Sequence, residues 1–178
     1  MASTGDRSPA GALARPLLKA EPTTIFGSVL TSQTAHLAYL TNDTDAAIRR
    51  FDSLGVGPWD TCEMPLQPIG AWVPECVIRA SFAHMAERML ELVEPLTDGS
   101  SIFPPPGGRA LKISFHHVGA FMDVDIQDVA TAADNAGLDI HRFPAPRGGA
   151  VMVDTRDTLG HWLEVLCFAR LGQHERPA

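Results

Sequence analysis

The sequence predicts an α+β fold built from two similar βαβββ modules. Two stretches carry this prediction, His36-Leu-Ala-Tyr-Leu-Thr-Asn-Asp43 and His117-Val-Gly-Ala-Phe-Met-Asp123. Each places a histidine on an alternating apolar segment, and each is followed by an amphipathic helix, a glycine and a lone glutamate inside an apolar strand, Glu91 or Glu164. A unit of this length that occurs only twice favours a duplicated domain over a solenoid.

The first module, residues 34–96, begins with a strand over residues 35–41. Asn42 or Asp43 can cap the following helix, whose apolar residues recur at helical spacing up to Gly55, 19 residues after His36. Three strands follow, over residues 59–64, 76–83 and 88–94, and the last two form a hairpin around His84.

The second module, residues 111–170, repeats this order. A strand over residues 113–122 precedes a helix that Asp125 caps and Gly137 ends, and Gly137 lies 20 residues after His117. Strands are predicted over 138–143, 150–153 and 161–168. The linker, 97–110, contains three consecutive prolines and two glycines, so it continues neither a strand nor a helix.

The remaining segments and the composition limit the possible classes of protein. Residues 1–30 are predicted as a flexible lead-in, 31–170 as one domain and 171–178 as a polar tail. A net charge of −7 without a basic cluster disfavours nucleic acid and anionic membranes as partners. No apolar run approaches 18 residues, and an odd number of cysteines, three, favours a reduced cytoplasmic setting.

The repeated histidine and glutamate predict a four-ligand metal site formed by His36, Glu91, His117 and Glu164. A carboxylate buried among apolar neighbours needs a charge partner, which a cation or an arginine provides. The alternative is a sheet with one wet face, on which each glutamate points to solvent. His117 is preferred over His116 because it keeps the register of His36, which places His116 on the opposite face of the strand. His84, His141, His161 and His174 have no partner in the repeat.

Two imidazoles and two carboxylates suit one divalent ion of manganese, iron, cobalt, nickel or zinc. The carboxylate content favours five or six ligands over a closed structural zinc site.

The motifs resemble those of the vicinal oxygen chelate superfamily, which includes glyoxalase I, methylmalonyl-CoA epimerase, extradiol dioxygenases and bleomycin-resistance proteins. The resemblance covers residues 34–170. Its carriers are His36-Leu-Ala-Tyr with Asp43, Leu90-Glu91-Leu-Val-Glu-Pro95, His116-His117-Val-Gly, and Asp154-Thr-Arg-Asp-Thr-Leu-Gly-His-Trp-Leu-Glu164. It implies that the two modules form one cupped mixed sheet around a central metal cleft, with the four residues at the ligand positions. It also implies a homodimer.

Glu91 stands where glyoxalase and epimerase members carry a fourth ligand, so the chain looks most similar to that branch. The resemblance implies an isomerase, epimerase or lyase that abstracts a proton beside a metal-chelated carbonyl through an enolate, with Glu91 or Glu164 as the base. Arg79 either recognises a substrate carboxylate or faces solvent, and Trp59 either lines the substrate cavity or belongs to the core. The alternatives are an iron-dependent extradiol-type dioxygenase and a metal-free small-molecule binding or resistance protein.

Overall fold

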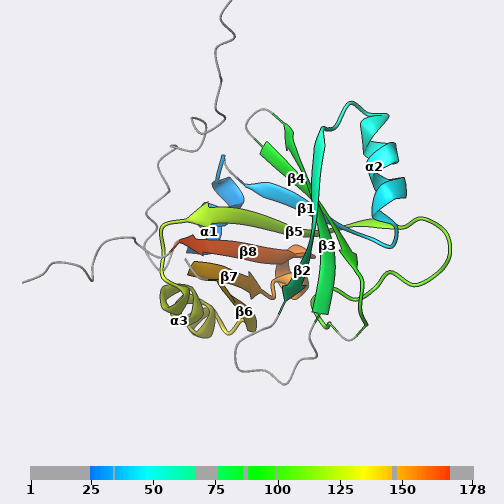
Figure 1. The fold of residues 1–178 in the computed structure, drawn as a ribbon. Helices are drawn as coiled ribbons and strands as arrows, with labels where there is room; N and C mark the ends of the chain where they lie inside the picture. Colours follow the sequence, from blue (N-terminus) through cyan, green and yellow to red (C-terminus); the bar gives the residue numbers. More distant parts are fainter. Residues whose placement is uncertain are drawn as a thin grey trace, which may run out of the picture.

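The computed structural model describes residues 25–33, 35–66, 76–85, 88–98, 100–145 and 148–168, and it confirms the two predicted modules (Figure 1). The first contains β1 (His36–Thr41), α2 (Thr44–Asp52), β2 (Trp59–Leu66), β3 (Cys76–Met85) and β4 (Arg88–Pro95). The second contains β5 (Ile113–Met122), α3 (Ile126–Ala136), β6 (Ile140–Ala145), β7 (Gly148–Val153) and β8 (Trp162–Phe168). Two short helices, α1 (Ile25–Thr31) and α4 (Arg156–Leu159), were not predicted.

The described strands form one mixed sheet in the order β2-β3-β4-β1-β5-β8-β7-β6. β1 and β5 pair antiparallel at the centre, and each also pairs parallel with the last strand of its own module, β4 or β8. The sheet is curled, so that β3 crosses the direction of β8 steeply in Figure 1. The equivalent strands of the two modules therefore meet in the middle of one curved surface.

Both predicted N-caps are present, whereas α2 ends at Asp52 with Ser53 as its C-cap, before the predicted stop at Gly55. Asp43 Oδ1 accepts a hydrogen bond from the backbone N–H of Ala46, and Asp125 Oδ1 accepts one from that of Gln127, both at 2.8 Å. Gly137 ends α3 in the left-handed conformation, with φ 66°, which glycine adopts without steric cost. These N-caps fix the points at which the chain leaves β1 and β5.

The outer face of the sheet is the one covered by helices. α2 lies against the first module, where its Phe51 ring packs on Tyr39 of β1 at 5.7 Å between ring centroids. In the second module, α3 and α1 cover a cluster of buried apolar residues that includes Met122, Val151 and Val165.

α1 corrects part of the predicted flexible lead-in. Ile25 and Val29, one helical turn apart, are fully buried in the cluster of the second module, and this burial holds residues 25–31 as a helix. Residues 1–24, like the predicted polar tail 171–178, lie outside the described residues. No helix within the described ranges is long and apolar enough to cross a membrane.

The inner face is the opposite one, and the linker packs on it. Ile102 and Phe103 are buried among inner-face residues of both modules, including Ile78 and Val93 of the first and Trp162 of the second. As predicted, residues 97–98 and 100–110 contain no helix or strand. The linker therefore connects the two modules through buried contacts as well as through the covalent chain.

Candidate metal centre

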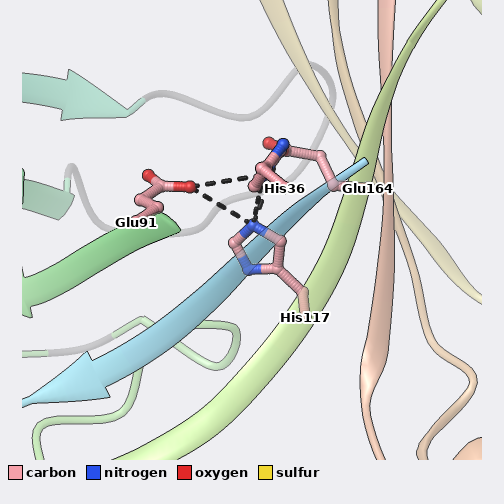
Figure 2. Close-up of side chains that lie close together, drawn as sticks. All are labelled: His36, Glu91, His117 and Glu164. Atoms are coloured by element: carbon pink, nitrogen blue, oxygen red, sulfur yellow. Dashed lines mark hydrogen bonds and ion pairs between the residues drawn. The ribbon is translucent and has the colours of Figure 1, made fainter. Parts of the chain in front are cut away.

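Four side chains meet on the inner face where β1 pairs with β5: His36, Glu91, His117 and Glu164 (Figure 2). Each offers one nitrogen or oxygen atom, and these four atoms all lie within 4.8 Å of one another. They are the four residues that the sequence predicts as ligands. Glu91 is buried and the side chain of Glu164 is only 15% exposed, so neither glutamate simply points to solvent.

The strand register explains why these residues converge. Ala38 of β1 stands opposite Glu91 of β4 on one side and opposite His117 of β5 on the other. Gly119 stands opposite His36 and opposite Glu164 of β8. Side chains that stand directly opposite each other on neighbouring strands share a face of the sheet, and so do side chains two residues apart along one strand. All four side chains therefore point to the inner face.

Gly119 leaves the space that the centre needs. A Cβ at this position would overlap Cε1 of His36 and would stand 2.8 Å from Glu164 Oε2. Any larger residue would therefore displace a ligand. Gly119 belongs to the quoted motif His117-Val-Gly, but the sequence alone does not reveal this steric requirement, because the crowding atoms come from other strands.

The distances fit a single divalent ion. His36 Nε2 lies 3.1 Å from His117 Nε2, 3.3 Å from Glu91 Oε2 and 3.0 Å from Glu164 Oε2. His117 Nε2 lies 3.5 Å from each of the two carboxylate oxygens. Two ligand atoms that are each about 2.1 Å from one ion stand about 3.0 Å apart at a right angle and about 3.4 Å apart at a tetrahedral angle. The donor set is also the one that borderline divalent metals prefer.

The two histidines and the two glutamates stabilise each other's charged forms. Burial acts to lower the pKa of His36, but hydrogen bonds and charge attraction to Glu164 and Glu91 outweigh it and raise the pKa to about 10. The pKa of His117 is raised for the same reasons. Burial acts to raise the pKa of Glu91 and of Glu164, but hydrogen bonds and attraction to the two histidines hold both well below the usual range. The two buried carboxylates thus need two compensating positive charges. Protons on the two histidines can supply these charges, and so can one divalent ion.

His116 corrects the expectation that it points away from His117. Ala38 pairs with His117 and Tyr39 pairs with Phe115, so His116 is the extra residue of a β-bulge, a device that redirects side chains. The His116 ring is buried on the inner side, where it stacks on Phe103 with ring centroids 4.9 Å apart. Burial, together with repulsion by His117, lowers the pKa of His116 to about 4.

Arg79 does not lie with the four residues. Phe82 of β3 stands opposite Glu91, and Arg79, three residues earlier, stands opposite Glu94 on the outer face. Its guanidinium group pairs there with Glu63 at 3.0 Å and Glu94 at 3.1 Å. Arg79 thus lies on the face turned away from the four residues, and recognition of a substrate carboxylate by Arg79 stays a prediction.

Trp59 lies on the outer face as well, because it stands opposite Ala83, the residue after Phe82. Its ring packs on Phe51 of α2 at 5.8 Å, and its indole N–H donates to Asp52 Oδ1 and to the carbonyl oxygen of Val56, each at 3.1 Å. Trp59 therefore anchors α2 to β2 on the outer face, and a place for Trp59 in the lining of a substrate cavity stays a prediction.

Comparisons with known proteins found likeness only among solved structures; no family model and no curated protein sequence matches the chain. The Streptomyces coelicolor methylmalonyl-CoA epimerase, solved with 2-nitronate-propionyl-CoA, is 15% identical, with a TM-score of 0.49 over 78% of this chain and 99% of that one. The epimerase of the same name from Mycobacterium tuberculosis is 14% identical, with a TM-score of 0.47 over 75% and 86%. A lactoylglutathione lyase from Agrobacterium tumefaciens is 21% identical, with a TM-score of 0.25 over 74% and 90%.

The strand order and the placement of the four residues agree with the resemblance noted in the sequence. Two βαβββ modules joined through β1 and β5 form one curled sheet, and its inner face carries one histidine and one glutamate from each module. This is the arrangement that the resemblance in the sequence implies. The chain therefore has the fold of the vicinal oxygen chelate superfamily.

Proposed function

We propose that the protein is a divalent-metal-dependent isomerase, epimerase or lyase that acts on a small molecule by removing a proton from the carbon beside a carbonyl. The observation that carries the proposal is the placement of four ligand atoms from both modules within 4.8 Å. His36, Glu91, His117 and Glu164 would hold the ion. When bound, a divalent ion acts as a Lewis acid that polarises a carbonyl and so acidifies the neighbouring C–H bond.

The two carboxylates are the groups of this chain that would move the proton. In Figure 2, Glu91 and Glu164 approach the imidazole pair from opposite sides, one from each module. Removal of a proton by one carboxylate and its return by the other would invert the carbon, which is an epimerisation. Return of the proton to a neighbouring carbon would give a shifted isomer, and loss of a neighbouring leaving group would make the reaction a lyase reaction.

The fourth ligand favours this chemistry over the alternatives. Extradiol-type oxygenation suits two histidines and one carboxylate, which leave open positions for substrate and oxygen. Here Glu91 Oε2 lies 3.3 Å from His36 Nε2 and 3.5 Å from His117 Nε2, which are distances that suit a second carboxylate ligand. A metal-free binding protein on this fold would have no need for four converging ligands.

Exchange with solvent deuterium tests the proposed reaction. The protein loaded with Mn²⁺, Co²⁺, Ni²⁺ or Zn²⁺ is incubated in deuterium oxide with 2-substituted acyl compounds, as free acids and as thioesters. We expect deuterium at the carbon beside the carbonyl of at least one compound, and none after chelation or with Glu91→Gln and Glu164→Gln. Oxygen uptake by the iron-loaded protein with catechols, and no exchange, would favour the dioxygenase instead.

The homodimer and the cytoplasmic location stay predictions. Light scattering on the purified protein measures the first, since a dimer has twice the chain mass of 19.1 kDa.

A further inference from the structure

We propose that His116 is a positioning residue that sets which ring nitrogen of His117 faces the metal, with the backbone carbonyl of Ile102 as the fixed end of the hydrogen-bond chain. The inference rests on the proposed function, because it concerns a ligand of the proposed metal centre. It adds the linker between the modules to the parts of the chain that determine metal affinity.

The hydrogen bonds assign the protons. His116 Nε2 lies 2.7 Å from the carbonyl oxygen of Ile102, and a carbonyl oxygen only accepts, so His116 Nε2 carries a proton. His116 Nδ1 lies 2.8 Å from His117 Nδ1, where one nitrogen donates and the other accepts. A neutral His116 has its lone pair on Nδ1 and therefore accepts, which leaves the proton on His117 Nδ1.

This assignment is the one that a metal needs. With its proton on Nδ1, His117 has its lone pair on Nε2, the atom that lies 3.1 Å from His36 Nε2 and 3.5 Å from both carboxylates. The opposite tautomer would point an N–H at the centre and block ligation. A hydrogen-bond partner behind a ligating histidine fixes its tautomer and ring orientation in metal sites generally.

The chain of hydrogen bonds is held in place from behind. The β-bulge brings His116 to the inner side, and the Phe103 ring stacks on it at an interplanar angle of 25°. The hydroxyl of Ser100 accepts hydrogen bonds from the N–H groups of Ile102 and Phe103, at 3.3 and 3.0 Å. Ser100, Ile102 and Phe103 are all buried, so the Ile102 carbonyl has a fixed position.

His36 provides an internal comparison. Its Nδ1 is buried and has no hydrogen-bond partner within the part of the chain that the structure describes. The two modules thus support their histidines differently, and a change at His116 should affect His117 while leaving His36 unchanged. A merely structural effect of His116 on the core would not distinguish the two ligands.

Two variants separate the hydrogen bond from packing. His116→Phe keeps an aromatic ring against Phe103 and removes the acceptor. His116→Asn loses the ring and places its side-chain oxygen close to the position of the imidazole Nδ1, where it can accept from His117. We expect His116→Phe to weaken Zn²⁺ binding by about 10- to 100-fold, and His116→Asn to recover a large part of this loss.

The decisive measurement is nitrogen NMR on the zinc-loaded wild-type protein with ¹⁵N-labelled histidine. We expect the His117 proton on Nδ1, zinc on Nε2, and a scalar coupling between the Nδ1 atoms of His116 and His117 across the hydrogen bond. Zinc on His117 Nδ1, or wild-type affinity in a folded His116→Phe variant, would overturn the inference but not the proposed function. A wild-type protein that binds no divalent metal would overturn both.

Discussion

Gly119 stands directly opposite His36 across the central pair of strands, and the ring of His36 occupies the space that a Cβ at Gly119 would need. The same Cβ would lie 2.8 Å from Glu164 Oε2. One glycine of the second module thus makes room for the histidine of the first. The two modules depend on each other at this point, because neither contains all four ligands.

Gly119→Ala should weaken metal binding more than it weakens the fold. The added methyl group displaces His36 or Glu164, and overpacking of this kind costs about 1–3 kcal/mol. We expect a Zn²⁺ affinity at least tenfold lower by calorimetric titration. Gly107→Ala is the matched control, since a Cβ there meets nothing within 4 Å. Equal affinities in the two variants would show that Gly119 does not shape the centre.

The stability of the metal-free protein should fall at alkaline pH. The folded pKa of His36 is raised to about 10 from its ordinary value of 6.5, so its stabilising charge is fully present below pH 6.5 and is lost as the pH rises towards 10. The pKa values of Glu91 and Glu164 are lowered from 4.5, so their contribution is present above pH 4.5 and is lost in acid.

Thermal unfolding with a chelator present, from pH 4.5 to 10, measures this dependence. We expect the highest Tm between about pH 4.5 and 6.5 and a decline above that range, because deprotonated imidazoles leave two carboxylates without charge partners. The metal-loaded protein, in which the ion supplies the positive charge, should decline less, and so should the chelated His36→Gln variant. A chelated wild-type protein that gains stability from pH 6.5 to 9.5 relative to His36→Gln would contradict the charge assignment.

Arg79→Gln should leave metal binding unchanged. Arg79 lies on the outer face, where it pairs with Glu63 and Glu94, and exposed pairs contribute about 0–1 kcal/mol. We expect a decrease of about 1 kcal/mol or less in the free energy of unfolding. Titration with Zn²⁺ and denaturant unfolding check the two expectations. A large loss of metal affinity would mean that the sheet faces are wrongly assigned.

The three cysteines should differ in reactivity. Cys62 is exposed, whereas Cys76 and Cys167 are buried, and burial raises the pKa of the Cys167 thiol to about 12. Because the thiolate is the reactive form, a disulfide reagent at pH 8 should modify one thiol of the native protein rapidly and the others only after unfolding. Cys62→Ser should abolish the rapid phase; rapid modification that persists in this variant would place a second thiol at the surface.

The repeat in the sequence is sufficient to predict the modules, the helix N-caps and the four converging residues. The prediction rests on strand alternation and on the matched positions of His36 and His117, because the two modules form the same elements from similar residues. The strand boundaries differ from the prediction by one or two residues, as at β2 and β6. Ile25 and Val29 were missed because a helix of two turns has too few residues to show a clear period.

The details that the sequence does not determine concern register and bulges. Whether Arg79 shares a face with Glu91 depends on Phe82 standing opposite Glu91, and no pattern within either strand determines that pairing. His116 was assigned to the wrong face because simple alternation holds only where no residue is inserted, and the bulge becomes visible only once β1 lies beside β5. Long-range pairing, which sequence periodicity does not contain, decides these details.

The central claim is that one divalent ion binds between the two modules, and metal content tests it most directly. The purified wild-type chain, Glu164→Gln and Glu63→Gln are each loaded with Zn²⁺, dialysed and measured by elemental analysis. Glu63 is the control because it is an exposed glutamate on the outer face. We predict one ion per chain in the wild type and in Glu63→Gln, and well below one in Glu164→Gln. Full occupancy in Glu164→Gln, or no bound ion in the wild type, would contradict the account.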